Sequence, residues 1–220
     1  MREWSADHPK AKLMARKRAA ILDAARTAFL QVGYEGTSME SIAAAAGVSI
    51  MTLYRHAASK EDLFAAVIVG ACDYSDEARQ VETAGLMQQT LEDALIYVGL
   101  SFQNKLYDPD TIGLLRTVMA ESTRFPVLAE TAYNGFIKTY EDNLNSFVAQ
   151  RPDGGDVAAG VRRELCSQFF ADLIGKDMLR ALLGLGAASP GKRRQRARDA
   201  AREMLAALAA SPERRAVADR

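Results

Sequence analysis

The sequence predicts an all-helical protein, and three observations lead to that prediction. Apolar residues recur every three or four positions along most of the chain, as they do on one face of a helix. Ser and Thr residues that can cap helices, and glycines that can end them, stand at the borders of these stretches. The sequence shows neither strand-like alternation nor an internal repeat. At 220 residues, 49% of them hydrophobic and 25% charged, the chain is expected to fold as one or two domains without a cofactor.

The first helix is expected from about residue 12 to residue 33, where Gly33 supplies a stop. Its apolar face consists of Ile21, Ala25, Ala28, Phe29 and Val32. The chain leading into this helix is a basic arm that contains Lys10, Lys12, Arg16, Lys17 and Arg18.

Two short helices joined by a turn come next. Thr37, with Glu40 three residues later, matches a capping box that opens a helix ending at Gly47. Ser49 is expected to cap a second short helix that runs through His56. Because a sharp corner needs a backbone angle that Gly adopts without steric cost, this stretch predicts a helix-turn-helix.

The rest of the chain is also predicted to be helical. Ser59 with Asp62 forms another capping box, which opens a fourth helix. Further helices are expected over residues 86–106, 111–122, 127–150, 156–184 and 190–209, separated by turn-forming Pro and Gly residues. The predicted division is a domain of residues 1–70, with the basic arm and the helix-turn-helix, and a larger helical domain of residues 71–220.

The second helix of a helix-turn-helix enters the major groove of DNA. Leu53 has the spacing from Val48 that turns it inward, which leaves the rest of Ser49 to His56 on the outside. The alternative is a plain corner between packed helices. DNA binding is favoured because polar groups cluster on one short helix, Lys60 stands in the first turn of the next helix, and the basic arm precedes both.

The stretch "ILDAARTAFLQVGYEGTSMESIAAAAGVSIMTLYRHAASKEDLFAAV", Ile21 to Val67, resembles the N-terminal DNA-binding domain of the TetR family of bacterial transcriptional regulators. The usual pattern of that family reads close to G-V-S-x-x-T-L-Y-R-H-F-x-S-K-E-x-L-F. The resemblance implies that Tyr54 and His56 contact phosphates or bases, and that Thr52 and Lys60 hold phosphates. It also implies that Thr37 and Ser38, at the start of the preceding helix, touch the DNA backbone. The full predicted DNA-binding set is Thr37, Ser38, Ser49, Ile50, Met51, Thr52, Tyr54, Arg55, His56 and Lys60.

Two positions depart from the family pattern. Ala57 stands where the pattern has Phe, and deleting a buried Phe costs about 3 to 5 kcal/mol unless a neighbour refills the space. Met51 or Phe64 is expected to refill it. Ile50 and Met51 occupy positions that are often basic or small, so this helix is expected to offer apolar contacts, for instance to thymine methyl groups.

The stretch "LLRTVMAESTRFPVLAETAYNGF", Leu114 to Phe136, resembles the AefR-like C-terminal domain found in one branch of this family. Aromatic and sulfur side chains recur through this half, and about two-thirds of them are expected to be ordinary core. The others are expected to line an apolar cavity for a small-molecule inducer of apolar or aromatic character. The predicted lining residues are Tyr97, Phe102, Met119, Tyr133, Phe136 and Phe169.

The last two helices are predicted to form a homodimer interface. The helix over 156–184 is apolar on two faces, so it needs a second partner, and Gly160, Ala171 and Gly175 would let another helix approach closely. Paired with the helix over 190–209, it is expected to make a four-helix contact with a second copy; packing within the monomer alone is the alternative. The basic run Gly191 to Arg202 is interpreted as a solvated helix face.

An enzyme is not expected, and neither is a metal site. The chain has two histidines, His8 and His56, and lacks a Gly-rich phosphate loop, a Cys-x-x-Cys pair and a Ser elbow. The separated Cys72 and Cys166, and a start without an apolar signal segment, predict a cytoplasmic protein. The sequence thus predicts a homodimeric repressor that binds a palindromic operator and is released by a ligand. The alternative is a DNA-binding regulator controlled by a protein partner or lacking a small-molecule inducer.

Overall fold

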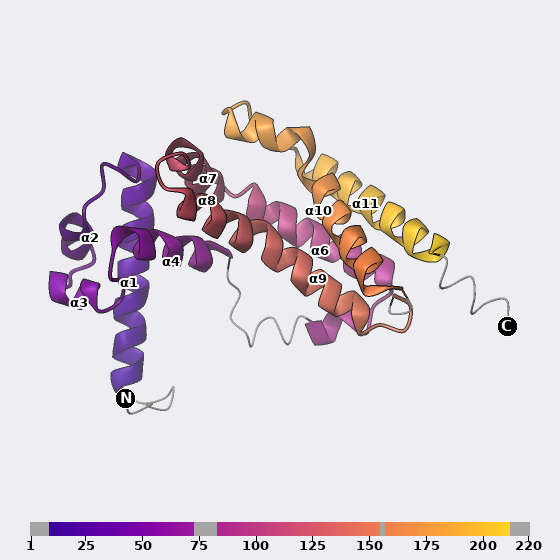
Figure 1. The fold of residues 1–220 in the computed structure, drawn as a ribbon, viewed down its shortest axis with the longest axis horizontal. Coiled ribbons are helices and arrows are strands. Elements are labelled where there is room, and N and C mark those ends of the chain that lie inside the picture. Colours follow the sequence, from indigo (N-terminus) through magenta and orange to yellow (C-terminus); the bar gives the residue numbers. More distant parts are fainter. Residues whose placement is uncertain (1–8, 73–82, 155–156, 212–220) are drawn as a thin grey trace. The chain divides into compact units, whose positions relative to one another are not determined.

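The structure is a computed structural model that describes residues 9–72, 83–154 and 157–211 (Figure 1). Every regular element in these ranges is a helix, so the predicted fold class is confirmed. None of these helices is both long and apolar enough to cross a membrane. The elements are α1 (Pro9–Val32), α2 (Met39–Ala45), α3 (Ile50–Tyr54), α4 (Lys60–Cys72), α6 (Leu91–Leu106), α7 (Pro109–Glu121), α8 (Pro126–Tyr133), the π-helix η1 (Asn134–Lys138), α9 (Thr139–Ala149), α10 (Ala159–Leu182) and α11 (Pro190–Ala210).

The chain divides into two compact units, and the division is not sequential. Among the described residues, the first unit combines 9–72 with 113–132, and the second combines 83–112 with 133–154 and 157–211. The predicted division at residue 70 assigns the whole later chain to one domain. Residues 113–132 instead join the first unit, where Gly113 lies directly against the Leu30 side chain.

The first unit is built on α1, which packs against α2 and α4, while α3 packs against α2 (Figure 1). Its core contains three fully buried rings, Phe29, Tyr34 and Phe64, whose centroids lie 4.9 to 5.8 Å apart. The ring of Phe125 adds to them, with its centroid 5.0 Å from that of Tyr34. Aromatic packing at these separations stabilises a core beyond the area that it buries.

The space at Ala57 is not refilled by Met51. Ala57 is buried, whereas 68% of the Met51 surface is exposed, so Met51 is not the neighbour that fills this space. Phe64, the other neighbour named for this role, is buried and packs edge-on against Phe29 and Tyr34. The structure therefore leaves Met51 available on the outside of α3.

The second unit is a bundle in which α11 packs against α6 and α10, and α10 also packs against α9 (Figure 1). Gly99 of α6 is a point of close approach, because a side-chain carbon there would lie 3.3 Å from Ala197, Leu173 and Phe169. A ring cluster of Phe102, Tyr140, Phe169 and Phe170 fills the interior, with neighbouring centroids 4.8 to 6.0 Å apart.

Helix α10 is broken at Gly175, which has φ 50° and ψ −169°. The helix predicted over residues 156–184 is therefore interrupted at Gly175. The space beside Gly175 is taken by the guanidinium of Arg196, 3.2 to 3.3 Å from where a Cβ would lie. Glycine adopts a positive φ without steric cost, so Gly175 permits the break at this position.

Candidate nucleic-acid interface

The first helix of the motif begins at a capping box one residue later than predicted. The Ser41 amide donates to Ser38 Oγ at 3.1 Å, and the Ser38 amide donates to Ser41 Oγ at 3.3 Å. These two bonds satisfy amides that the first turn of α2 leaves without partners. The expected pair of Thr37 and Glu40 does not form the box, because the Thr37 hydroxyl donates to Gly33 O at 2.7 Å and is buried.

A glycine turn connects α2 to α3. Gly47 has φ 64°, its amide donates to Ala44 O at 3.1 Å, and the next amide, that of Val48, donates to Ala43 O at 3.0 Å. These bonds form the Schellman arrangement, which ends a helix with a left-handed residue. Ser49 then caps α3 as predicted, since its Oγ accepts from the Thr52 amide at 3.2 Å.

Helix α3 has one buried anchor and a broad exposed face. Leu53 is fully buried, as predicted, while Met51 is 68% and Tyr54 45% exposed. Arg55 is also exposed, and Ile50, Thr52 and His56 are half-buried. The structure therefore presents the residues from Ser49 to His56, with Leu53 as the inward exception, on one short helix and its two ends.

Positive charge gathers at the C-terminal end of α3. Partial burial lowers the pKa of His56 below its ordinary value, and the charges of Arg18, Arg55 and Lys17 lower it further. Lys17 and Arg18 belong to the basic arm on α1, so the fold brings part of that arm close to α3. A neutral imidazole beside cations is suited to gain a proton when a phosphate arrives.

Lys60 has a role that the sequence does not reveal. Its Nζ donates to Tyr34 O at 2.8 Å and to Thr37 O at 2.9 Å, and it lies 3.4 Å from Glu35 O. It also lies 4.5 Å from the centroid of the Tyr34 ring. The ammonium group thus ties the start of α4 to the turn between α1 and α2. These partners are 23 to 26 residues away in sequence, too far for any capping pattern to predict them.

The six residues predicted to line a ligand cavity differ in burial. Phe102, Phe136 and Phe169 are buried in the second unit, and Phe102 and Phe169 both pack against Phe170. The other three are 45 to 59% exposed; they are Tyr97, Met119 and Tyr133. Met119 also belongs to the first unit, whereas the rest belong to the second. Helical periodicity shows which residues share a face, but not which face another helix covers.

Two family profiles match the chain. The profile of bacterial regulatory proteins of the tetR family matches residues 21–67, and the profile of the AefR-like transcriptional repressor C-terminal domain matches residues 93–210. Among curated proteins, the HTH-type transcriptional regulator UidR of Escherichia coli K12 is 26% identical over 167 residues, which cover 71% of this chain and 76% of UidR. The HTH-type transcriptional regulator RutR of the same organism is 42% identical over 59 residues, which cover 27% of this chain and 28% of RutR.

Solved structures agree with these matches. A TetR-family transcriptional regulator from Mesorhizobium loti superposes with a TM-score of 0.73 at 28% identity, covering 88% of this chain and 96% of that one. The Flavonoid-responsive Regulator FrrA superposes with a TM-score of 0.63 at 30% identity, covering 87% of this chain and 95% of that one. The profile matches, the helix-turn-helix and the helical second unit lead to one conclusion: the chain belongs to the TetR family of bacterial transcriptional regulators.

Proposed function

We propose that the chain is a one-component repressor that binds a palindromic operator as a homodimer, with α3 in the major groove. The observation that carries this proposal is the division of α3 into a buried anchor, Leu53, and exposed Met51, Tyr54 and Arg55. A helix held in this way can present its outer face to base edges. Arg55 supplies hydrogen-bond donors, and Met51 supplies an apolar surface for thymine methyl groups.

Phosphate contacts are assigned to the cations and polar groups around α3. Lys17, Arg18 and His56 lie close enough together to influence the charge of the imidazole. Ser38 and Ser49, at the starts of α2 and α3, are both exposed. Contacts of this kind set the register of a protein on DNA without reading its sequence. They also make binding depend on salt.

Dimerisation is assigned to the outer face of α10 and α11. An open groove of about 460 Å³ is lined by residues of both helices, among them the small residues Ala171, Gly175 and Ala200. The lining also carries charges of both signs; those residues are Asp172, Asp199, Glu203, Lys192 and Arg196. A surface with small residues and mixed charges can pair with its own copy around a twofold axis. The contact of α10 with α11 inside the monomer leaves this face open, which supports pairing between copies over packing within one copy.

Release by a small apolar or aromatic ligand is the remaining part of the proposal. It is supported by the match to a repressor domain over residues 93–210 and by the 30% identity to a regulator named as flavonoid-responsive. The second unit is also rich in aromatic side chains, among them Phe102, Tyr140, Phe169 and Phe170, which is consistent with an aromatic ligand. Such a ligand would favour a dimer whose two α3 helices no longer match the operator.

Control by a protein partner, or without a small inducer, is the second candidate. The observation that favours it is the exposure of Tyr97 and Tyr133 on the surface of the second unit, where a partner protein can reach them.

One selection experiment tests these assignments. Fragments bound by the purified protein are selected from a random DNA pool, and the selection is repeated with flavonoids and other aromatic compounds that raise the melting temperature. We expect an inverted repeat whose half-site centres lie about 34 to 36 Å apart, or a multiple of that distance. A direct repeat or a lone half-site would contradict the twofold dimer. Compounds that bind the protein with equal affinity in the presence and absence of operator would favour partner control.

A further inference from the structure

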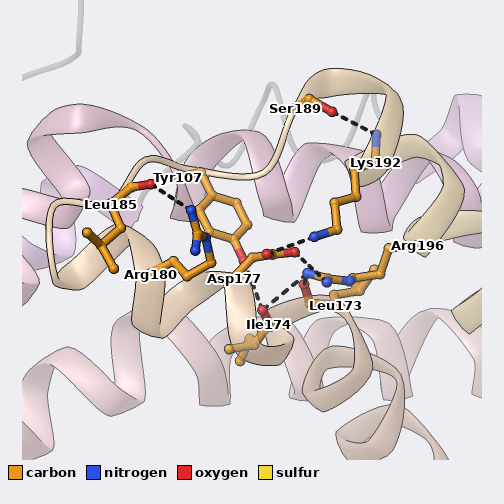
Figure 2. A network of polar contacts seen from close by, with 9 residues as sticks. All are labelled: Tyr107, Leu173, Ile174, Asp177, Arg180, Leu185, Ser189, Lys192 and Arg196. Carbon is orange, nitrogen blue, oxygen red and sulfur yellow. Dashed lines mark hydrogen bonds and ion pairs between the residues drawn. The ribbon is translucent and has the colours of Figure 1, made fainter.

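The break in α10 is stabilised by hydrogen bonds from side chains of two other helices (Figure 2). The Tyr107 hydroxyl, at the end of α6, donates to Ile174 O at 2.9 Å. Arg196 of α11 places Nη1 3.4 Å from both Leu173 O and Ile174 O. A residue with a non-helical conformation interrupts the backbone ladder, so carbonyls next to it need other donors. Tyr107 and Arg196 supply them.

Asp177 secures the other side of the break. Its carboxylate is 3% exposed and lies 2.9 Å from Lys192 Nζ and 2.6 Å from Arg196 Nη2 (Figure 2). The hydrogen bond from Lys192 is the main cause of a pKa for Asp177 below the ordinary value, so the group is charged at neutral pH. Arg196 therefore contacts the chain both before and after Gly175. Lys192 remains 51% exposed, as expected for a solvated face, whereas Arg196 of the same basic run is only 18% exposed and departs from that prediction.

The same side chains connect the break to the corner between α6 and α7. Tyr107 is the C-cap of α6, and α7 begins two residues later at Pro109. Its ring also belongs to a small buried cluster with Ile112, Ala181 and Met178. A change at Gly175 would thus act directly on the residues that set the start of α7, a helix whose residues from Gly113 onward belong to the first unit.

We propose that the break at Gly175 is a two-state joint, at which α10 changes between the observed broken form and a continuous helix. Glycine is compatible with both forms, because it adopts helical angles as well as a positive φ. The continuous form regains backbone bonds across residue 175, while the broken form has the side-chain bonds from Tyr107 and Arg196. Straightening withdraws the Ile174 carbonyl from Tyr107 and releases the corner between α6 and α7. Under the proposed function, operator or ligand shifts this balance if it prefers one form.

A double-mutant cycle on the full-length protein tests the joint without DNA. Tyr107→Phe removes only the hydroxyl, and in the otherwise unchanged protein we expect it to lower the folding equilibrium constant about fivefold. Gly175→Ala favours the continuous helix, because alanine avoids a positive φ and is a better helix former. In that background Tyr107→Phe should have no effect, since the bond is already absent. Equal effects in the two backgrounds would mean a rigid kink and would overturn the proposal.

Gly191→Ala is the matched control, because Gly191 lies in α11 with open space where a side chain would go. In the Gly191→Ala background, Tyr107→Phe should lower the folding equilibrium constant as much as it does in the unchanged protein. If Gly175→Ala fails to fold, Asp177→Asn takes its place in the cycle. Asp177→Asn weakens the ion pair that keeps Arg196 at the broken form. Additive effects of Asp177→Asn and Tyr107→Phe would again overturn the joint.

A regulatory role is tested by operator affinity. Tyr107 does not line the groove assigned to dimerisation, so Tyr107→Phe should change operator affinity about fivefold or more while sedimentation shows an unchanged oligomeric state. A coupled cycle with unchanged affinity would overturn the joint as a regulatory element. If the unchanged protein does not bind DNA, the proposed function is refuted instead. The double-mutant cycle would still decide whether the joint exists.

Discussion

The helix-turn-helix in the first unit and the joint at Gly175 in the second are positioned by contacts between residues at different separations in sequence. The caps of α2 and α3 are hydrogen bonds between residues three apart, and the turn between them is fixed by amides donating three to five residues back. At the joint, Tyr107 and Ile174 are 67 residues apart, and Arg196 reaches Asp177 across 19 residues. A local arrangement needs only residues that are near one another in sequence, whereas a distant one requires the whole unit to be folded.

The helix-turn-helix motif is therefore not held by local bonds alone. Its caps shape α2 and α3, but the buried rings of Phe29 and Phe64 pack α1 against α4, and Lys60 of α4 bonds to the turn before α2. In the first unit, we expect distant contacts to control stability and the exposed face of α3 to control sequence recognition.

The largest effect is expected from Phe64→Ala. The ring of Phe64 is fully buried and packs edge-on against two other rings, so its removal should cost about 3 to 5 kcal/mol of unfolding free energy. Denaturant unfolding followed by circular dichroism measures this cost. Met51→Ala, on the exposed face of α3, is the control and should change the unfolding free energy by less than about 0.5 kcal/mol. Similar losses for both variants would place Met51 in the core after all.

Lys60→Ala should destabilise the first unit by about 1.5 to 3 kcal/mol, because hydrogen bonds from a charged donor to Tyr34 O and Thr37 O are lost. Binding to operator and to random DNA should weaken alike, since the turn before α2 is displaced. Titrations at several salt concentrations and a melting curve check both expectations. Arg163→Ala, at an exposed cation of α10 away from Gly175, is the control. A change of sequence preference at unchanged melting temperature would refute the positioning role.

Operator affinity should rise about 3- to 10-fold as the pH falls from 7.5 to 5.5. The pKa of His56 in the free protein lies below its ordinary value of about 6.5, so the group is neutral at pH 7 and a nearby phosphate favours its protonation on binding. His56→Gln should remove this rise. Because the folded protein binds fewer protons at His56 than the unfolded chain, this group's contribution to stability falls as the pH drops below about 6.5. Melting curves over the same pH range separate that effect, and a rise that persists in His56→Gln would assign the proton to another group.

The smallest effect is expected from Met51→Ser and Ile50→Ser. Each should cost about 1 kcal/mol at one base pair of the operator and little elsewhere, because an apolar contact with a thymine methyl is lost. Competition assays with single base-pair changes measure this pattern. An equal loss on every site would show that these residues support the helix and do not read bases.

The predicted caps show how far local reasoning reaches. Ser49 caps α3 as expected, and Ser59 Oγ accepts from the Asp62 amide at 3.0 Å at the start of α4. At α2 the box is Ser38 with Ser41 in place of Thr37 with Glu40. Thr37 and Ser38 are adjacent residues that can both cap a helix, and the Thr37 hydroxyl is instead engaged in its bond to Gly33 O. That bond depends on how α1 ends, which a capping pattern does not contain.

By itself, the sequence determined the helical class, the helix-turn-helix and the order of the helices, because periodicity, caps and glycine stops act over a few residues. Only the tertiary structure decided that residues 113–132 join the first unit, that Lys60 holds a turn, and that α10 breaks at Gly175. It also decided which aromatic residues are buried. The physical reason is the same in each case. These features depend on which groups meet across long stretches of chain, and such meetings are set by the packing of whole helices, which no short pattern in the sequence specifies.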